Sequence, residues 1–231
     1  MAELFDQYDK NYGDVVGDSI SFSGLKHDFF MQAKADLIER KLAGMGKLAP
    51  DSKLAALDIG CGIGTMHRYI RPLFDTIDGC DVSSESVERA SRENPGVCYR
   101  HYEAGSELPY QSETFDFAMT VCVVHHVPPA FWPEFFSEMH RVLKPGGLAC
   151  VIEHNPFNPA TRLAVLRCPF DEDAVLLRSG KTHSLMRAAG FKTPKSEFFL
   201  ALPSAKPLAR RLEQSISSLP VGAQYASFAT V

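Results

Sequence analysis

Two groups of residues in this sequence have the types and spacing of a binding or catalytic site. The first is a set of glycines that follows an apolar segment, and the second is a set of histidines and a glutamate that follow two later apolar segments. The glycines are Gly60, Gly62 and Gly64, in the segment LAALDIGCGIGT (residues 54–65). Glycine has no Cβ, so the backbone can turn sharply there and approach a ligand closely. Asp58 stands two residues before the first glycine. Because a carboxylate repels phosphate and attracts cations, this turn is expected to bind a positively charged molecule.

Asp81 is a second residue with a clear chemical use. It ends a short segment, residues 76–81, that the pattern predicts to be a strand. A carboxylate at that point can accept hydrogen bonds from both hydroxyls of a ribose, and a hydrogen bond to a charged group contributes about 1.5–3 kcal/mol. Ribose recognition is common to several nucleotide cofactors. Capping of the following helix is the alternative role.

The candidate catalytic residues are His125, His126, Glu153 and His154. The histidine pair follows one apolar segment and the Glu-His pair follows the next. Histidine has an unperturbed pKa near neutrality, so it can take a proton from a hydroxyl group at physiological pH. The alternative is structural, since such residues also pack the start of the next helix or hydrogen-bond their own turn.

The elements that must position these residues alternate between strand and helix. We expect strands at 54–59, 76–81, 97–102, 115–121 and 148–153, with helices at 65–74, 83–93 and 128–143. This rhythm is typical of a parallel α/β sheet covered on both faces. After Glu153 three prolines predict an insertion at about 155–180. A helix at 182–189, a strand at 196–202, a helix at 208–216 and a strand at 224–230 follow. The result is a doubly wound, seven-stranded, mostly parallel sheet with an antiparallel edge strand.

The N-terminal part of the chain is expected to form a lid (residues 1–46), followed by the main domain (residues 47–231). Within the lid, apolar residues recur at helical spacing from Leu25 to Leu42, which predicts a covering helix ending near Gly44 and Gly46. We expect a ligand pocket to be roofed by aromatic residues of the lid and by three residues of the insertion: Phe5, Tyr8, Tyr12 and Phe22, with Arg162, Arg167 and Phe170.

Composition limits the partners. The 231 residues carry a formal charge of −4, which argues against a nucleic-acid binder and favours a small-molecule partner. The apolar run at 117–124 is too short to span a bilayer and the first residues lack a basic signal-peptide start, so we expect a cytoplasmic monomer or homodimer. The six cysteines form no Cys-x-x-Cys pair and no zinc-type cluster, so we expect reduced thiols and no metal site.

Five blocks of the sequence resemble the class I S-adenosylmethionine-dependent methyltransferases. They occur in that family's order over about residues 54–152: Leu57-Asp-Ile-Gly-Cys-Gly-Ile-Gly, Gly79-Cys-Asp81, Ala104-Gly-Ser-x-Leu-Pro-Tyr, Phe115-Asp-Phe and Leu143-Lys-Pro-Gly-Gly. The chain is also distantly similar to ubiquinone-pathway O-methyltransferases. Those enzymes carry acidic, metal-binding residues where this chain has Cys122 and His125, so the resemblance gives no support for a metal.

The resemblance implies a Rossmann-like fold and a set of S-adenosylmethionine contacts. Gly60, Cys61 and Gly62 would line the methionine and ribose parts, and Asp81 would hold the ribose. Val82 would lie beside adenine. The remaining implied contacts are Ala104 and Gly105 at the adenine edge, Val121 at the methionine end, Tyr12 in the lid, and the acidic Asp58.

Methyl transfer from a sulfonium is an in-line displacement, in which alignment alone can supply about 7–11 kcal/mol. The expected function is therefore transfer of a methyl group to oxygen or nitrogen of a small-molecule acceptor, with S-adenosylhomocysteine as product. Two alternatives stay open at this point. One is an NAD-dependent oxidoreductase, although Thr65 stands where the third dinucleotide glycine belongs. The other is a module that binds S-adenosylmethionine without turnover.

Overall fold

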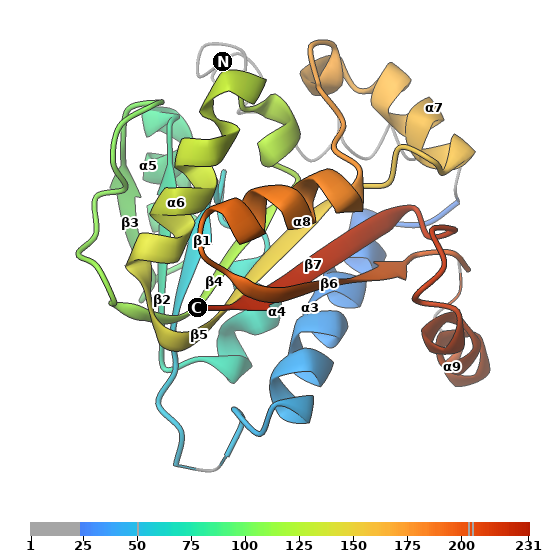
Figure 1. Ribbon diagram of the computed structural model, residues 1–231, viewed down its shortest axis with the longest axis horizontal. Coiled ribbons are helices and arrows are strands. Elements are labelled where there is room, and N and C mark those ends of the chain that lie inside the picture. The colour runs from blue at the N-terminus through green and yellow to red at the C-terminus, as the bar shows by residue number, and fades with distance from the viewer. Residues whose placement is uncertain (1–23, 50, 203, 205) are drawn as a thin grey trace.

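A seven-stranded sheet forms the centre of the molecule (Figure 1). The computed structural model describes residues 24–49, 51–202, 204 and 206–231. The strands are β1 Ala55–Ile59, β2 Thr76–Asp81, β3 Cys98–His101, β4 Phe115–Val121, β5 Leu143–His154, β6 Lys192–Phe199 and β7 Gln224–Thr230. Their order is β3-β2-β1-β4-β5-β7-β6, and only the pairings of β7 with β5 and with β6 are antiparallel. The predicted mostly parallel α/β sheet is confirmed.

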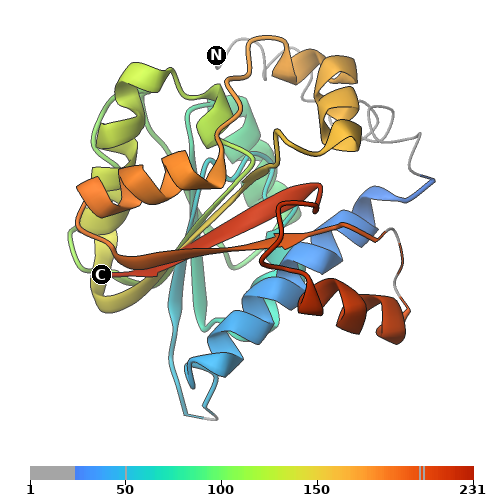
Figure 2. The same cartoon turned by 45° about the vertical axis from the view of Figure 1, so that its right-hand side comes forward.

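Helices cover both faces of this sheet. They are α3 His27–Gly44, α4 His67–Ile70, α5 Ser84–Glu93, α6 Trp132–Val142, α7 Pro159–Arg167, α8 Ser179–Ala188 and α9 Pro207–Ser215. Figure 2 shows α3 along one face, with α6 and α8 on the other. Successive side chains of a strand point to opposite faces, so Ala56 joins the core beneath α3 while Leu57 joins the core beneath α6 and α8. None of the described helices is both long and apolar enough to cross a membrane.

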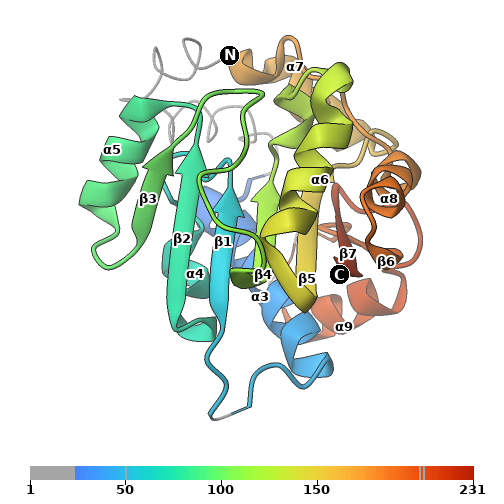
Figure 3. The same ribbon diagram turned by 60° about the vertical axis from the view of Figure 1, so that its left-hand side comes forward.

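The parallel register brings the carboxyl ends of β1, β2, β4 and β5 to one edge of the sheet. Asp58 pairs with Gly79 on β2 and with Met119 on β4, and Val121 pairs with Ile152 on β5. In Figure 3 these ends lie at the top, below α7. The segments after the four strands therefore meet in space, which is where open α/β sheets bind ligands.

Two predicted elements differ in length for reasons visible in the sequence. The helix predicted at 65–74 is the single turn α4, followed by a 3₁₀ turn over Arg71–Leu73. Pro72 lies in that turn, and proline cannot donate the backbone hydrogen bond that an α-helix needs. Strand β5 begins at Leu143, which pairs with Phe115 before a shift of register. Residues 144–147, which the predicted bounds leave between a helix and a strand, therefore form an irregular start of β5.

The insertion contains a helix that the sequence did not predict. Asn158 accepts a hydrogen bond from the backbone N–H of Thr161, and Pro159 occupies the first turn of α7. Proline is tolerated in a first turn because its missing N–H would have no partner there. One of the three prolines that predicted an irregular insertion therefore lies in the first turn of a helix. A 3₁₀ turn, Pro169–Asp171, then carries the chain back toward the sheet edge.

Candidate active site

The turn after β1 requires glycine at Gly60. Its φ is +75°, and a Cβ placed there would lie 2.6 Å and 2.7 Å from the two methyl groups of Val123. Gly62 has a φ of +51° but open space around it. The backbone N–H groups of Gly60 and Cys61 donate to the carbonyl of Cys80, which fixes the turn against β2. The glycines therefore let the backbone pass close to the segment that follows β4.

Asp81 ties the glycine turn to the segment after β2. Its Oδ2 accepts a hydrogen bond from the N–H of Gly62 at 2.8 Å, and its Oδ1 accepts one from the N–H of Ser83 at 2.9 Å. The side chain that caps α5 belongs to Ser83, which accepts from the N–H of Ser86. Burial raises the pKa of Asp81, against the effect of its hydrogen bonds. Each carboxylate oxygen keeps a lone pair for a ligand hydroxyl.

Asp58 has one carboxylate oxygen in a buried hydrogen-bonded chain and one without a partner. Its Oδ2 lies 3.0 Å from Nε2 of His67, whose Nδ1 lies 2.5 Å from the hydroxyl of Tyr99. Its Oδ1 is buried and has no hydrogen-bond partner among the described residues. A buried unpaired polar atom costs about 1–3 kcal/mol. Asp58 lines the cavity described below, so a donor or positive charge on a bound ligand fits this oxygen.

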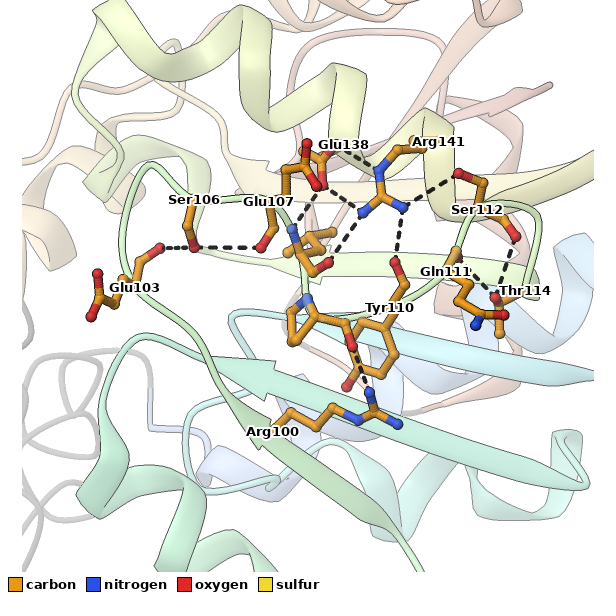
Figure 4. A network of polar contacts seen from close by, with 12 residues as sticks. Arg100, Glu103, Ser106, Glu107, Tyr110, Gln111, Ser112, Thr114, Glu138 and Arg141 are labelled. Atoms are coloured by element: carbon orange, nitrogen blue, oxygen red, sulfur yellow. Dashed lines mark hydrogen bonds and ion pairs between the residues drawn. The ribbon is translucent and has the colours of Figure 1, made fainter.

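The loop after β3 is held from outside by a charged pair on α6 (Figure 4). Arg141 donates to the carbonyls of Leu108 and Tyr110, and Glu138 accepts from the N–H of Leu108 at 2.7 Å. The hydrogen bond from Arg141 holds the pKa of Glu138 below its usual value. These contacts anchor the loop that carries Ala104 and Gly105. Sequence reasoning missed both members of the pair.

One cavity of about 780 Å³ joins these features, a volume typical of small-molecule sites. Residues from every candidate group line it: Asp58, Gly60, Cys61, Gly62, Asp81, Val82, Ala104, Gly105, Val121, His125, His126 and His154. Tyr12, Phe5, Tyr8 and Phe22 lie outside the described residues. Phe170 lines the cavity, whereas Arg162 and Arg167 are exposed and do not.

Glu153 is buried behind the cavity wall rather than facing the ligand space. Its Oε1 accepts from the backbone N–H groups of Val123 and Val124, and its Oε2 lies 2.5 Å from Nδ1 of His125. Glu153 has no exposed surface. Asn155 is equally enclosed, because its side-chain amide donates to the carbonyls of Pro220 and Gly222. Neither residue lines the cavity.

Asp171 completes a cluster that sequence reasoning did not find. Its Oδ1 lies 3.4 Å from Nε2 of His125 and 3.5 Å from Nε2 of His126. The ring of His154 lies 5.1 Å from the ring of His125. Asp171 comes from the insertion, 46 positions after His125 in the numbering, and only its place after Cys168-Pro-Phe marked it in the sequence. We call His125, His126, His154 and Asp171 the histidine cluster.

The charges within the histidine cluster oppose one another. Burial favours a neutral His125, but the carboxylates of Glu153 and Asp171 outweigh it and raise its pKa to about 10. Burial and the neighbouring His125 lower the pKa of His126 and of His154 to about 4. A single cationic ring thus stands between two carboxylates, with two neutral imidazoles beside it.

A buried cation from α3 also lines the cavity. Lys34 is 3% exposed, and burial lowers its pKa. No carboxylate of the described residues forms an ion pair with it, and the thiol of Cys122 acts on it electrostatically, raising its pKa against the effect of burial. Cys122 itself accepts a hydrogen bond from the side chain of Gln224 at 3.3 Å. The helix predicted as a cover therefore also forms a wall of the site.

A parallel α/β sheet with a glycine turn and a ribose-type carboxylate at its carboxyl edge defines a class of nucleotide-cofactor enzymes. Comparison with known proteins identifies the family. The model of the methyltransferase domain matches residues 57–151. The uncharacterized methyltransferase sll0829 of Synechocystis is 31% identical over 156 residues, covering 66% of this chain and 72% of that protein. The chain therefore belongs to the S-adenosylmethionine-dependent methyltransferases, and the predicted cofactor is confirmed over NAD.

Two further relatives agree with this assignment. The ubiquinone biosynthesis O-methyltransferase of Ruegeria pomeroyi is 33% identical over 134 residues, covering 53% of this chain and 53% of that protein. The crystal structure of an S-adenosylmethionine-dependent methyltransferase from Thermotoga maritima superposes with a TM-score of 0.69 at 21% identity, covering 100% of this chain and 99% of that one. The second match shows that the two proteins share a fold.

Proposed function

We propose that this chain transfers the methyl group of S-adenosylmethionine to an oxygen or nitrogen atom of a small molecule bound beside the histidine cluster. The observation that carries the proposal is that a single cavity contains both the glycine turn and this cluster. In-line displacement needs the acceptor atom, the methyl carbon and the sulfur aligned within one enclosed space. The similarity to a ubiquinone biosynthesis O-methyltransferase supports an oxygen acceptor.

On the donor side, the proposed contacts follow the groups that each part of the cofactor offers. Asp81 would accept from the ribose hydroxyls, and Asp58 would face the positively charged methionine end, where its Oδ1 has no hydrogen-bond partner in the described part of the chain. The other proposed contacts are Gly60, Cys61 and Gly62 at the methionine and ribose, Val82, Ala104 and Gly105 at the adenine, and Val121 near the sulfur.

On the acceptor side, His126 and His154 are the proposed proton acceptors, because both line the cavity as neutral imidazoles. His125 lines it too, with Glu153 as its positioning residue. This division of roles revises the expectation that all four residues act directly. A buried Glu153 with three hydrogen bonds has no free path to an acceptor.

The wall of the proposed acceptor pocket comes from two parts of the chain that are far apart in the sequence. We propose that the N-terminal segment, residues 1–46, and the insertion, about residues 155–180, together shape the acceptor pocket of a single methyltransferase domain. Supporting this, α3 contributes Lys34 and the insertion contributes Asp171 to the same cavity, while Leu37 and Leu42 of α3 pack into the core of the sheet. The buried charge of Lys34 favours an acceptor with an acidic group.

Methyl-labelled S-adenosylmethionine tests the proposal directly. The purified chain is incubated with the labelled cofactor and with fractionated small-molecule extracts, and products are followed by mass spectrometry and by label. We expect label in a small acidic metabolite, with equimolar S-adenosylhomocysteine. Tight cofactor binding without a labelled product in any fraction would instead support a cofactor-binding module without turnover.

A further inference from the structure

The histidine cluster brings together ligand atoms of a kind that binds metals. One ligand atom each of His125, His154 and Asp171 lies within 4.8 Å of the other two. The three residues come from the segment after β4, the end of β5 and the turn after α7. Their separation along the chain explains why no metal-type spacing is visible in the sequence.

His125 is held in the orientation that a metal-binding histidine needs. Its Nδ1 faces the carboxylate of Glu153, which directs Nε2 toward Asp171. A carboxylate on the far nitrogen fixes the tautomer and ring orientation of metal-ligating histidines in this way. Nε2 is buried, and it makes no well-aligned hydrogen bond among the described residues although Asp171 is near. Without a metal this nitrogen carries a proton and forms an ion pair with Asp171, and a metal bound at the centre of the cluster would take the place of that proton.

The spacing of the atoms also suits a small divalent ion. The Oδ1 of Asp171 lies 3.4 Å from Nε2 of His125 and 3.5 Å from Nε2 of His126. In a tetrahedral site with bonds of about 2.0–2.1 Å, neighbouring ligand atoms are about 3.4 Å apart. The ligand atoms of the triad lie within 4.8 Å of one another, so the widest pair would have to approach by up to about 1.4 Å, through side-chain rotation, to reach the tetrahedral spacing.

We propose that His125, His154 and Asp171 form a site for a divalent transition metal, with Zn²⁺ as the expected occupant. Two imidazoles and one carboxylate suit zinc and neighbouring transition metals, whereas Mg²⁺ and Ca²⁺ prefer oxygen ligands. Three protein ligands leave a coordination position open, and all three residues line the cavity. His126 borders the site through its contact with Asp171.

Metal binding at this site does not depend on the proposed function. A role for the metal in catalysis, however, rests on the proposed methyl transfer. A metal at this position would take an acceptor oxygen as a further ligand and stabilise its deprotonated form, as metals do for bound water. With a metal bound, His154 would act as a ligand and no longer as a proton acceptor, so the hydroxyl proton would pass to His126 or to solvent. The oxygen would then form a bond to the methyl carbon while the carbon–sulfur bond breaks, and the sulfur would keep that electron pair.

Metal titration of the untagged protein tests the site. The chain is stripped with a chelator, and Zn²⁺ binding is measured by calorimetry and by metal analysis after dialysis. We expect one Zn²⁺ per chain, with Mg²⁺ unable to compete. Asp171→Asn and His154→Ala should each weaken Zn²⁺ binding by at least about 10–100-fold, since even outer-sphere changes have effects of that size. Asp173→Asn, an exposed acid in the same segment, and His183→Ala on α8 should leave it unchanged.

Two further measurements separate the alternatives. S-adenosylhomocysteine binding by each variant shows that the chain is folded and reports on the donor site independently of the metal. The absorption spectrum of the Co²⁺-loaded chain distinguishes nitrogen and oxygen ligands from thiolates, because Cys61, Cys122 and Cys168 also line the cavity. The proposal is overturned if the stripped chain takes up no Zn²⁺, if Asp171→Asn and His154→Ala bind it like Asp173→Asn, or if the spectrum shows thiolate ligation.

Discussion

The proposed donor and acceptor halves of the cavity are built by different means. The donor half uses backbone: glycines at positive φ, N–H groups that meet Asp81, and a loop anchored by Arg141. The acceptor half uses side chains from distant segments, namely Lys34, the histidines after β4 and β5, and Asp171. Backbone geometry suits one invariant cofactor, whereas side chains can be exchanged to suit an acceptor. The comparison predicts that donor-side changes impair folding and cofactor binding, while acceptor-side changes leave cofactor binding intact.

The largest effect is expected for Gly60→Ala. Positive φ costs about 1–2 kcal/mol for a residue with a Cβ, and contact with the Val123 methyl groups at 2.6 Å adds overpacking of about 1–3 kcal/mol. The free energy of unfolding, measured with urea, should fall by the sum of the two. Gly62→Ala is the matched control, because its φ is positive but nothing lies within 4 Å of its Cβ. Equal losses in the two variants would show that close approach to Val123 is unimportant.

Asp81→Ala should have the next largest effect, and on the cofactor. It removes the acceptor of two backbone hydrogen bonds and of the proposed ribose contacts. One lost hydrogen bond to a charged group corresponds to about 1.5–3 kcal/mol, so the Kd for S-adenosylhomocysteine should rise about tenfold or more. Asp78→Ala on the same strand, outside the cavity, should leave the Kd unchanged. Similar Kd values for the two variants would show that Asp81 does not contact the cofactor.

Lys34→Met tests the acceptor half. A buried charge destabilises the fold unless it is paired, and no described residue forms an ion pair with Lys34, so its removal should raise the free energy of unfolding by about 1 kcal/mol or more. The Kd for S-adenosylhomocysteine should stay constant, while KM for an acidic acceptor should rise. Lys41→Met, on the same helix and over the ring of Phe228, should give no such gain in stability. Weaker cofactor binding in Lys34→Met would place the cation in the donor half instead.

Arg141→Met should have the smallest effect and should depend on pH. Arg141 lowers the pKa of Glu138 from 4.5, so the pair stabilises the folded chain above that value and loses its contribution as the pH falls through the lowered pKa. Urea denaturation at a series of pH values should give wild type a free energy of unfolding about 1 kcal/mol higher than that of Arg141→Met at neutral pH. The difference between the two proteins should disappear at acid pH. A constant difference across the series would mean that packing, rather than the ion pair, holds the loop.

The two halves also differ in what the sequence could predict. The glycine turn, Asp81 and the strands before them are contiguous, and their local pattern predicted the sheet and the cofactor class. Asp171 and Lys34 reach the cavity only through tertiary packing of the insertion and α3, so local pattern gave no signal for them. Glu153 was selected for its position at a strand end, but hydrogen bonds from the N–H groups of Val123 and Val124 hold it behind the wall of the cavity.

A crystal structure of the chain with bound S-adenosylhomocysteine tests the central claim, that both halves serve one reaction. We expect the ribose hydroxyls to lie on Asp81 and the sulfur atom to face the histidine cluster across open space for an acceptor. A sulfur directed away from His126, His154 and Asp171, or a cofactor that fills the space beside them, would contradict it.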